Sequence, residues 1–133
     1  MLRDAKAGRA MPFAVEFQGE FVGQLNVSDI TRGALWGCHI GYWIDQRVSN
    51  RRIMTTAVAM VTDYLLLEAR LHRVEVAVRP ENVPSNALVQ RLGFRFEGLR
   101  KAFLHIDGAW RDHNVYVMLR EDVDQPLVRK YDL

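Results

Sequence analysis

Two polar side chains three residues apart, Asn82 and Ser85, follow a β-branched run and open an amphipathic stretch that stops at Gly93. Val83 precedes a proline and is pushed away from helical angles, which predicts a helix that begins at Pro84. Either polar side chain can satisfy the first unpaired amides of that helix. The exit of a buried strand is also where folds that combine strands and helices place their ligands. The residues alone leave capping and ligand binding open.

A second candidate site is the turn at residues 45–52, between an expected strand and an expected long helix. Unpaired N–H groups and the helix dipole converge at such a helix start, which favours phosphate. Arg47, Arg51 and Arg52 add positive charge there. The alternative is an ordinary strand–helix turn with solvated arginines, and this segment by itself favours that alternative.

The elements that must position these residues follow from hydrophobic periodicity. The chain alternates between strand-like and helical apolar spacing, with glycine turns between the segments. No domain boundary interrupts this order, which predicts a single α+β domain over residues 1–133. The polar end, 123–133, contains a proline and is expected to be loosely held. The expected elements are a hairpin over 11–30 turning at Gln18-Gly19-Glu20, a strand over 36–44, a helix over 51–70, a strand over 72–78, the helix from Pro84, and a final strand and hairpin over 94–119 turning at Asp107-Gly108.

Composition narrows the class of protein. A chain of 133 residues that is 49% hydrophobic is long enough for one soluble domain with its own core. The net charge of +2 tolerates an anionic ligand but does not indicate a nucleic-acid protein, since the sequence shows no basic face and no RNA-binding aromatic motif. The single cysteine suits a reducing cytoplasm. No apolar run is long enough to span a bilayer, and no signal-peptide segment begins the chain.

Thiol and metal chemistry are weighed next. Cys38 and His39 are neighbours on the expected strand 36–44, where Cys38, Ile40 and Tyr42 share one face and His39, Gly41 and Trp43 share the other. Because neighbours point to opposite faces, the cysteine and the histidine cannot pair as nucleophile and base. We therefore expect a buried cysteine. The four histidines lack a ligand spacing, so no metal is expected; they are His39, His72, His105 and His113.

Three motifs carry a family resemblance. The first is the GYWID segment at 41–45, the second is the pattern Asn-x-x-Ser-x-x-Leu-x-x-x-Leu-Gly-Phe at 82–94, preceded by LHRVEVAVRPEN, and the third is the DGAWRDH hairpin at 107–113. Together they are similar to the GNAT superfamily of acyl-CoA-dependent N-acetyltransferases. Within it they resemble the RimJ/RimL-type ribosomal-protein N-terminal acetyltransferases, over residues 12–122.

The resemblance implies a fold and a cofactor. The fold would be a mixed, strongly twisted, mostly antiparallel sheet with helices on its faces, in which strand 41–44 splays from its parallel neighbour 74–78. The pantetheine arm of acetyl-CoA would lie in this V-shaped gap, with its pyrophosphate over residues 47–53. The implied cofactor-binding residues are Tyr42, Trp43, Ile44, Arg47, Asn50, Arg51, Arg52, Ile53, Met54, Thr55, Asn82, Ser85 and Asn86.

The implied reaction is direct transfer of an acetyl group to an amine, the N-terminus of a protein, in one ternary complex. A backbone amide near Trp43 and Ile44 would face the thioester carbonyl as an oxyanion donor. Ser85 would return a proton to the departing thiolate. No metal takes part, and neither a nucleic acid nor a membrane is an expected partner.

The general base stays open. Some Rim-type enzymes are thought to use a glutamate where this chain has Leu104, which cannot take a proton. His105 and Asp112 are the candidates retained beside Ser85 as catalytic residues, with His113 and Glu97 as further alternatives. Each of these is otherwise read as surface polarity or a structural hydrogen bond, and water could also suffice.

Two departures from the family support a rival reading. The phosphate loop of the family carries glycine or alanine where this chain has Asn50 and Arg52, and Arg52 would either crowd a diphosphate or bind it. The chain also begins after the family's first strand and helix pair, which leaves acceptor recognition open and could expose the core to a partner subunit in a homodimer. The rival is a degenerate domain with weak CoA binding and no turnover. Within the enzyme class, a small-molecule amine is the alternative acceptor.

Overall fold

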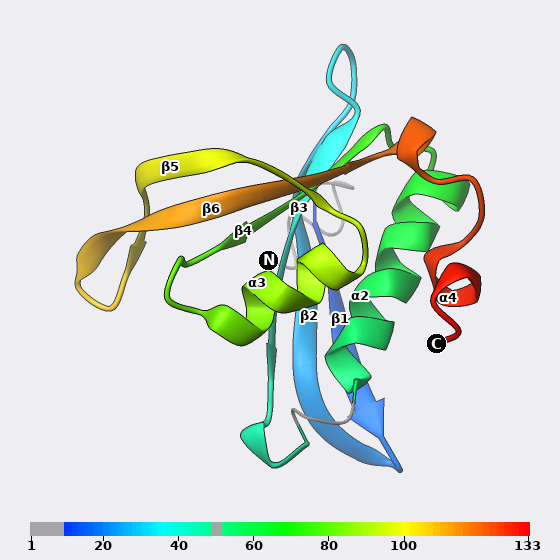
Figure 1. Cartoon of the computed structure of the whole chain (residues 1–133), viewed down its shortest axis with the longest axis horizontal. Coiled ribbons are helices and arrows are strands. Elements are labelled where there is room, and N and C mark those ends of the chain that lie inside the picture. Colours follow the sequence, from blue (N-terminus) through cyan, green and yellow to red (C-terminus); the bar gives the residue numbers. More distant parts are fainter. Residues whose placement is uncertain (1–9, 49–51) are drawn as a thin grey trace.

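The computed structural model describes residues 10–48 and 52–133 and forms one sheet with helices against it (Figure 1). The predicted hairpins form because both two-residue turns reach the left-handed region, with φ of 53° and 82° at Gln18 and Gly19 and of 52° and 80° at Asp107 and Gly108. Turns with positive φ at both central residues match the twist of the flanking strands. The strands are β1 (Met11–Phe17), β2 (Glu20–Thr31), β3 (Gly37–Ile44), β4 (Arg73–Val78), β5 (Arg95–Ile106) and β6 (Ala109–Leu119).

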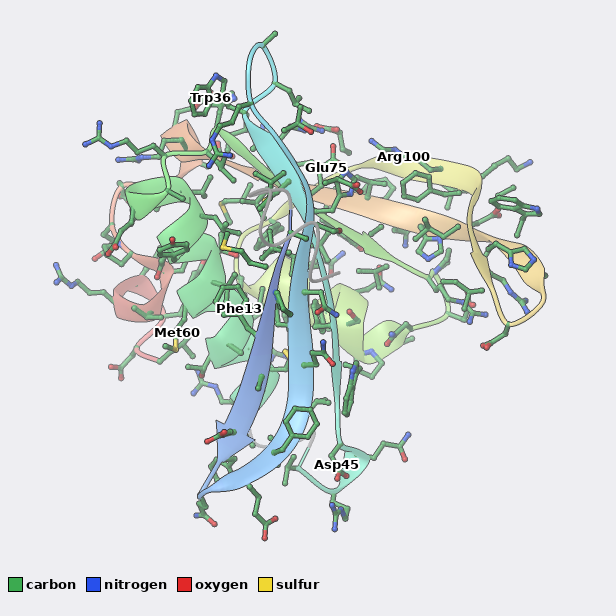
Figure 2. All side chains as sticks on the ribbon, turned by 180° about the vertical axis from the view of Figure 1, so that it is seen from behind. Phe13, Trp36, Asp45, Met60, Glu75 and Arg100 are labelled. Atoms are coloured by element: carbon green, nitrogen blue, oxygen red, sulfur yellow. The ribbon has the colours of Figure 1, made fainter. Side chains whose placement is uncertain are left out.

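The helices lie where the periodicity predicts them. α2 (Ile53–Asp63) continues into a π-helical turn at Tyr64–Glu68, and α3 (Val83–Arg91) begins one residue before the predicted proline. Both helices cover the same face of the sheet (Figure 1). The opposite face carries no helix among the described residues and is turned toward the viewer in Figure 2.

The core lies between that helical layer and the sheet. Its largest fully buried members come from the strands, from α2 with the π-helical turn, from α3, and from the segments after them: Leu25, Val27, Val58, Leu65, Leu66, Leu71, Val74, Val76, Val89, Leu92 and Tyr116. Alternation holds along β3 as predicted, since Cys38 and Ile40 are buried in this core and His39 points to the other face.

The two central strands diverge. The strand order is β1-β2-β3-β4-β6-β5, with β3 and β4 as the parallel pair. Their pairing runs from Gly37↔Arg73 to Ile40↔Val76 and stops there. Beyond this point β3 continues to Ile44 paired with β2, and β4 continues to Val78 paired with β6. The V-shaped opening expected from the family resemblance is present.

The C-terminal segment differs from its prediction. Residues 123–133 were expected to be loosely held, whereas Leu127 is only 3% exposed and Val123 is buried in the core. The short helix α4 (Leu127–Lys130) begins against α2, where the Asp63 carboxylate accepts the backbone N–H groups of Leu127 at 2.7 Å and Val128 at 3.2 Å. The sequence did not predict this contact, because the residue that caps α4, Asp63, lies 64 positions before Leu127 in the chain.

Candidate active site

A cavity of about 590 Å³ opens on the helical side of the divergence between β3 and β4. Three segments line it: the end of β3 with the turn after it, the start of α2, and one side of α3. This volume lies in the range of small-molecule and cofactor sites. The lining residues are Tyr42, Trp43, Ile44, Gln46, Arg52, Met54, Thr55, Asn82, Pro84, Ser85, Ala87, Leu88 and Arg91.

The first turn of α3 answers whether Asn82 and Ser85 cap a helix or face a ligand. Asn82 is the N-cap, and its Oδ1 accepts the backbone N–H of Ser85 at 3.2 Å. The Ser85 hydroxyl is then left for other partners, and its Oγ lies 2.6 Å from the phenolic oxygen of Tyr42. Capping therefore belongs to Asn82, while Ser85 presents a hydroxyl within the cavity lining.

Tyr42 is the residue to which Ser85 is coupled. Burial raises the pKa of Tyr42 to about 12, although the hydrogen bond to Ser85 acts in the opposite direction. The phenol is consequently neutral at physiological pH and keeps a proton to donate. The pair forms a short chain of two hydroxyl groups that can pass a proton toward the cavity.

Asn86, predicted to bind the cofactor, is occupied within the protein. Its Nδ2 donates to the carbonyl oxygens of Arg79 at 3.0 Å and Asn82 at 2.8 Å. Its Oδ1 accepts from the Tyr116 hydroxyl at 2.6 Å and from Asn114 Nδ2 at 3.1 Å. Both donors and both acceptor positions of the amide are used, and Asn86 does not line the cavity. We assign it a structural role that fixes α3 to β6.

The structure describes two of the four residues predicted for the phosphate loop, Arg47 and Arg52. Arg52 stands immediately before α2 with φ of 58°, in the left-handed region that glycine adopts more readily, and it lines the cavity. Arg47 is exposed and forms a bidentate pair with Asp45, its Nη2 2.6 Å from the carboxylate, so its charge is already matched. Asn50 and Arg51 lie outside the described residues.

Three further predicted residues follow the start of α2. Met54 and Thr55 line the cavity. Ile53 instead lines a second cavity of about 480 Å³ between α2 and the edge strand β1. Of the predicted cofactor set, the structure thus brings Tyr42, Trp43, Ile44, Arg52, Met54, Thr55, Asn82 and Ser85 together around one space.

The candidate bases are not among the cavity residues. His105 is exposed beside Trp110 near the tip of the β5–β6 hairpin, with the ring centres 5.3 Å apart. Asp112 accepts the backbone N–H of Ala102 at 2.8 Å and so holds the irregular stretch of β5. Both lie outside the cavity lining, so their catalytic roles stay predictions that the geometry does not favour.

The two alternatives to these bases are also engaged elsewhere. His113 is buried, and its Nδ1 contacts the Arg111 carbonyl oxygen at 3.0 Å. Glu97 is bound by the Arg73 guanidinium, which lowers the pKa of that carboxyl. Neither side chain lines the cavity.

Cys38 and His39 lie on opposite faces, as predicted. Burial, with a smaller contribution from the negative charge of Glu75, raises the pKa of the Cys38 thiol to about 12. A thiol that stays protonated is a poor nucleophile. In the described ranges, 10–48 and 52–133, no group of three His, Cys, Asp or Glu side chains is placed to hold a metal ion. The same ranges contain no helix long and apolar enough to cross a membrane.

Several lining residues were missed from the sequence. Pro84, Ala87, Leu88 and Arg91 follow one another at helical spacing along one side of α3, so the period that predicted the helix also carried the signal. Arg91 adds a second positive charge to the cavity beside Arg52. Gln46 had no comparable signal, because it begins the 3-10 helix η1 (Gln46–Val48), which is too short to show a periodic pattern.

The geometry matches that of known proteins. The profile of the acetyltransferase (GNAT) domain family covers residues 1–95. The solved structure of Mycobacterium smegmatis RimJ in complex with CoA-disulfide superposes with a TM-score of 0.94 at 43% identity, over 98% of this chain and 63% of that one. The chain belongs to the GNAT acetyltransferase family. The GNAT fold and the RimJ/RimL-type resemblance inferred from the sequence are thereby confirmed.

Relatives with curated names extend the match. A probable N-acetyltransferase of Bacillus subtilis, YjcK, is 38% identical over 78% of this chain and 58% of its own length. The [Ribosomal protein uS5]-alanine N-acetyltransferase of Escherichia coli is 35% identical over 77% of this chain and 53% of its own length. The chain therefore spans somewhat more than half the length of these relatives.

Proposed function

We propose that this GNAT domain transfers the acetyl group of acetyl-CoA to the N-terminal amine of a protein. The observation that carries the proposal is the end of β3–β4 pairing at Ile40↔Val76, beside a cavity into which Ser85 and Tyr42 are brought together. The name of the uS5-alanine acetyltransferase relative supports a ribosomal-protein N-terminus as the acceptor class.

The residues present fit acetyl-CoA. The edge of β3 at residues 41–44 that faces away from β2 has lost its β4 partner, so its backbone groups are free to pair with the amides of a pantetheine arm. At Gly41 an added Cβ would meet nothing within 4 Å, so the strand is open there. Arg52 and Arg91 give the cavity the positive charge that a diphosphate requires.

The cofactor supplies an acetyl group activated as a thioester, and the protein supplies positioning and protons. Holding the acceptor beside the thioester provides much of the acceleration. A backbone amide near Trp43 and Ile44 stabilises the developing oxyanion. Ser85 would donate its proton to the leaving sulfur and take one from Tyr42, which its raised pKa keeps protonated at rest. Tyr42 would then regain a proton from solvent through the cavity.

The proposal is tested in two steps. Calorimetry with acetyl-CoA measures binding, and mass spectrometry then detects a mass increase of one acetyl group on a short peptide that begins with alanine. Spermidine serves as a comparison acceptor. Binding with acetylation of the peptide supports the proposal; acetylation of spermidine alone replaces the acceptor class. Lack of binding at millimolar acetyl-CoA overturns the enzymatic function and favours the degenerate domain.

A further inference from the structure

A histidine–glutamate pair lies on the face of the sheet opposite the helices. His39 on β3 and Glu75 on β4 are paired in register, one position before the last parallel pair, Ile40↔Val76. Their facing atoms, Nε2 of His39 and Oε2 of Glu75, are 3.2 Å apart. Figure 2 shows Glu75 on this face, which no helix of the described residues covers. The pair therefore stands where β3 and β4 begin to separate.

Among the residues that the structure describes, small residues border the divergence next to this pair. The next β3 residue on the same face is Gly41, about 7 Å along the strand from His39. A Cβ built at Gly41 would have no neighbour within 4 Å. On β4 the corresponding position beyond Glu75 is Ala77, a small side chain. A group that enters the divergence from this face thus passes His39 before it reaches the cavity side, where Ser85 and Tyr42 lie.

The surroundings orient the imidazole. Glu75 is 7% exposed, and its Oε1 is held by Arg73 at 2.9 Å and by Arg100 at 3.5 Å. Its buried Oε2 has no aligned hydrogen bond among the described residues, although it is within reach of His39 Nε2. A carboxylate in this position favours the tautomer that carries the proton on Nε2. The lone pair then lies on Nδ1 of a side chain that is 31% exposed.

We propose that His39 is the general base of the acetyl transfer, that Glu75 positions it, and that the acceptor amine approaches from the face opposite the helices. This inference rests on the proposed acetyltransferase function. The amine nitrogen forms a bond to the acetyl carbon while the carbon–sulfur bond breaks. The amine proton passes to Nδ1 of His39, and the thiolate takes the proton of Ser85. The products are an N-acetylated peptide, CoA, an imidazolium stabilised by Glu75, and a Ser85–Tyr42 pair that has given up one proton. Release of the imidazolium proton to solvent and uptake of one proton by the pair restore the starting state.

Like the bases predicted from the sequence, His39 lies outside the cavity lining, and it differs from them in standing beside the end of the β3–β4 pairing. Besides Glu75, the charged groups linked to His39 through this network are Arg73 on β4 and Arg100 on β5, which both bind Glu75, and Glu97 on β5, which binds Arg73. Ser28 is its register neighbour on β2. Glu97 is neutralised by Arg73, so the carboxylate nearest to the imidazole is Glu75.

The test compares His39→Gln with the wild-type protein. We measure kcat/KM for an alanine-starting peptide across pH, together with acetyl-CoA affinity by calorimetry and the melting temperature. We expect the variant to lose about 100-fold in kcat/KM near neutrality. The variant should also lose one limb of the wild-type pH profile and keep only that of the acceptor amine. Acetyl-CoA affinity should not change.

Two further variants separate a catalytic role from a structural one. His72→Gln removes another partly exposed histidine that faces a glutamate, at 2.8 Å from Glu121, and should leave rate and profile unchanged. Activity of His39→Ala should be restored in part by added imidazole, which a purely structural role would not permit. This second variant also decides the question if glutamine disturbs folding.

Three results would overturn the inference. An active wild-type protein whose His39→Gln variant keeps both rate and pH profile overturns the base alone and leaves the proposed function standing. Failure of imidazole to restore a folded, inactive His39→Ala variant also overturns the base alone. A wild-type protein that binds acetyl-CoA and acetylates no amine overturns both proposals.

Discussion

At the residue scale, the start of α3 divides two tasks between neighbouring side chains. Asn82 satisfies the Ser85 backbone amide, so the Ser85 hydroxyl is not needed as a cap and contacts Tyr42 instead. A helix start that needed the serine as its cap could not offer that hydroxyl to a ligand. We therefore expect a substitution of Ser85 to lower turnover while it changes the free energy of unfolding little.

Ser85→Ala should lower turnover by about 10- to 100-fold if the hydroxyl returns the proton to sulfur. The free energy of unfolding should fall by no more than about 1 kcal/mol, because the cap is retained. Steady-state kinetics, acetyl-CoA calorimetry and urea unfolding measure the three quantities, with Thr31→Ala as a control at an exposed hydroxyl of β2. Unchanged turnover would remove Ser85 from the mechanism.

Arg52 combines a strained backbone with a charge at the cavity. Arg52→Gly should weaken acetyl-CoA binding about 10-fold through loss of a charge-assisted hydrogen bond. It should also raise unfolding stability by up to about 1 kcal/mol, since glycine suits a φ of 58°. Arg70→Gly is the matched control, because Arg70 is an exposed arginine with φ of 60° that does not line the cavity.

Calorimetry on the two arginine variants separates charge from backbone. Both substitutions should remove the backbone strain of an arginine with positive φ. Only Arg52→Gly should change the affinity for acetyl-CoA. Tighter binding in Arg52→Gly would mean that the side chain obstructs the diphosphate, the other outcome considered from the sequence.

At the element scale, a single amide on α3 makes several of the hydrogen bonds that fix this helix to the sheet. Asn86 joins the helix to Tyr116 and Asn114 of β6 and to the carbonyl oxygen of Arg79 after β4. Tyr116 is 2% exposed, so its hydroxyl depends on a protein partner. The position of Ser85 in the cavity is thus set by the residue that follows it.

Asn86→Ala should destabilise the protein by roughly 2–4 kcal/mol, because it removes the acceptor of the buried Tyr116 hydroxyl and the donor to the carbonyl oxygens of Arg79 and Asn82. Urea unfolding measures the loss. Gln90→Ala is the control on the same helix, since its contact with the Tyr116 hydroxyl is a longer one of 3.4 Å, and it should cost less than about 0.5 kcal/mol. Equal effects of the two substitutions would contradict the role given to Asn86.

At the scale of the whole molecule, two buried acids link stability to alkaline pH. Burial raises the pKa of both Cys38 and Tyr42 to about 12 in the folded protein. Their unfolded values are about 8.5 and about 10, so the folded state binds more protons than the unfolded state in the interval between. The stability that they contribute is complete below about pH 8.5 and is lost as the pH rises toward about 12.

Unfolding free energy should therefore fall by roughly 2–4 kcal/mol between about pH 9 and about pH 11. Urea midpoints measured across this interval test the slope. The double variant Cys38→Ala/Tyr42→Phe should flatten it, whereas Tyr64→Phe, at an exposed tyrosine, should not. An identical slope in the double variant would show that other groups control the alkaline transition.

The parts of the fold that could be predicted from the sequence are those set by neighbours along the chain. The glycine turns and the alternation of Cys38 and His39 along β3 depend on local geometry, and the structure has them as expected. A polar cap at the start of α3 was also expected, and the structure assigns it to Asn82, one of the two candidates. The divergence of β3 and β4 was predicted from the family resemblance, since no local sequence pattern shows where the hydrogen bonds between two strands end.

What could not be predicted depends on contacts between distant residues. The Tyr42–Ser85 pair spans 43 positions, and the Asp63 cap on α4 spans 64. Polarity made the tail look loose, and the family resemblance made Asn86 a predicted cofactor residue, because a sequence does not show which polar group is already satisfied. His39 was considered only as a partner of Cys38 or as a metal ligand, since the sequence does not show that Glu75, on another strand, lies beside it.

The interrupted ladder between β3 and β4 has a consequence for selectivity. Backbone groups left without a neighbouring chain are hydrated, and any molecule that takes the place of that water must offer donors and acceptors in a similar order. An apolar molecule would leave those backbone groups without hydrogen-bond partners and would bind poorly, even if it filled the cavity well. The backbone of β3 therefore favours ligands that carry amide groups, independently of the side chains around the cavity.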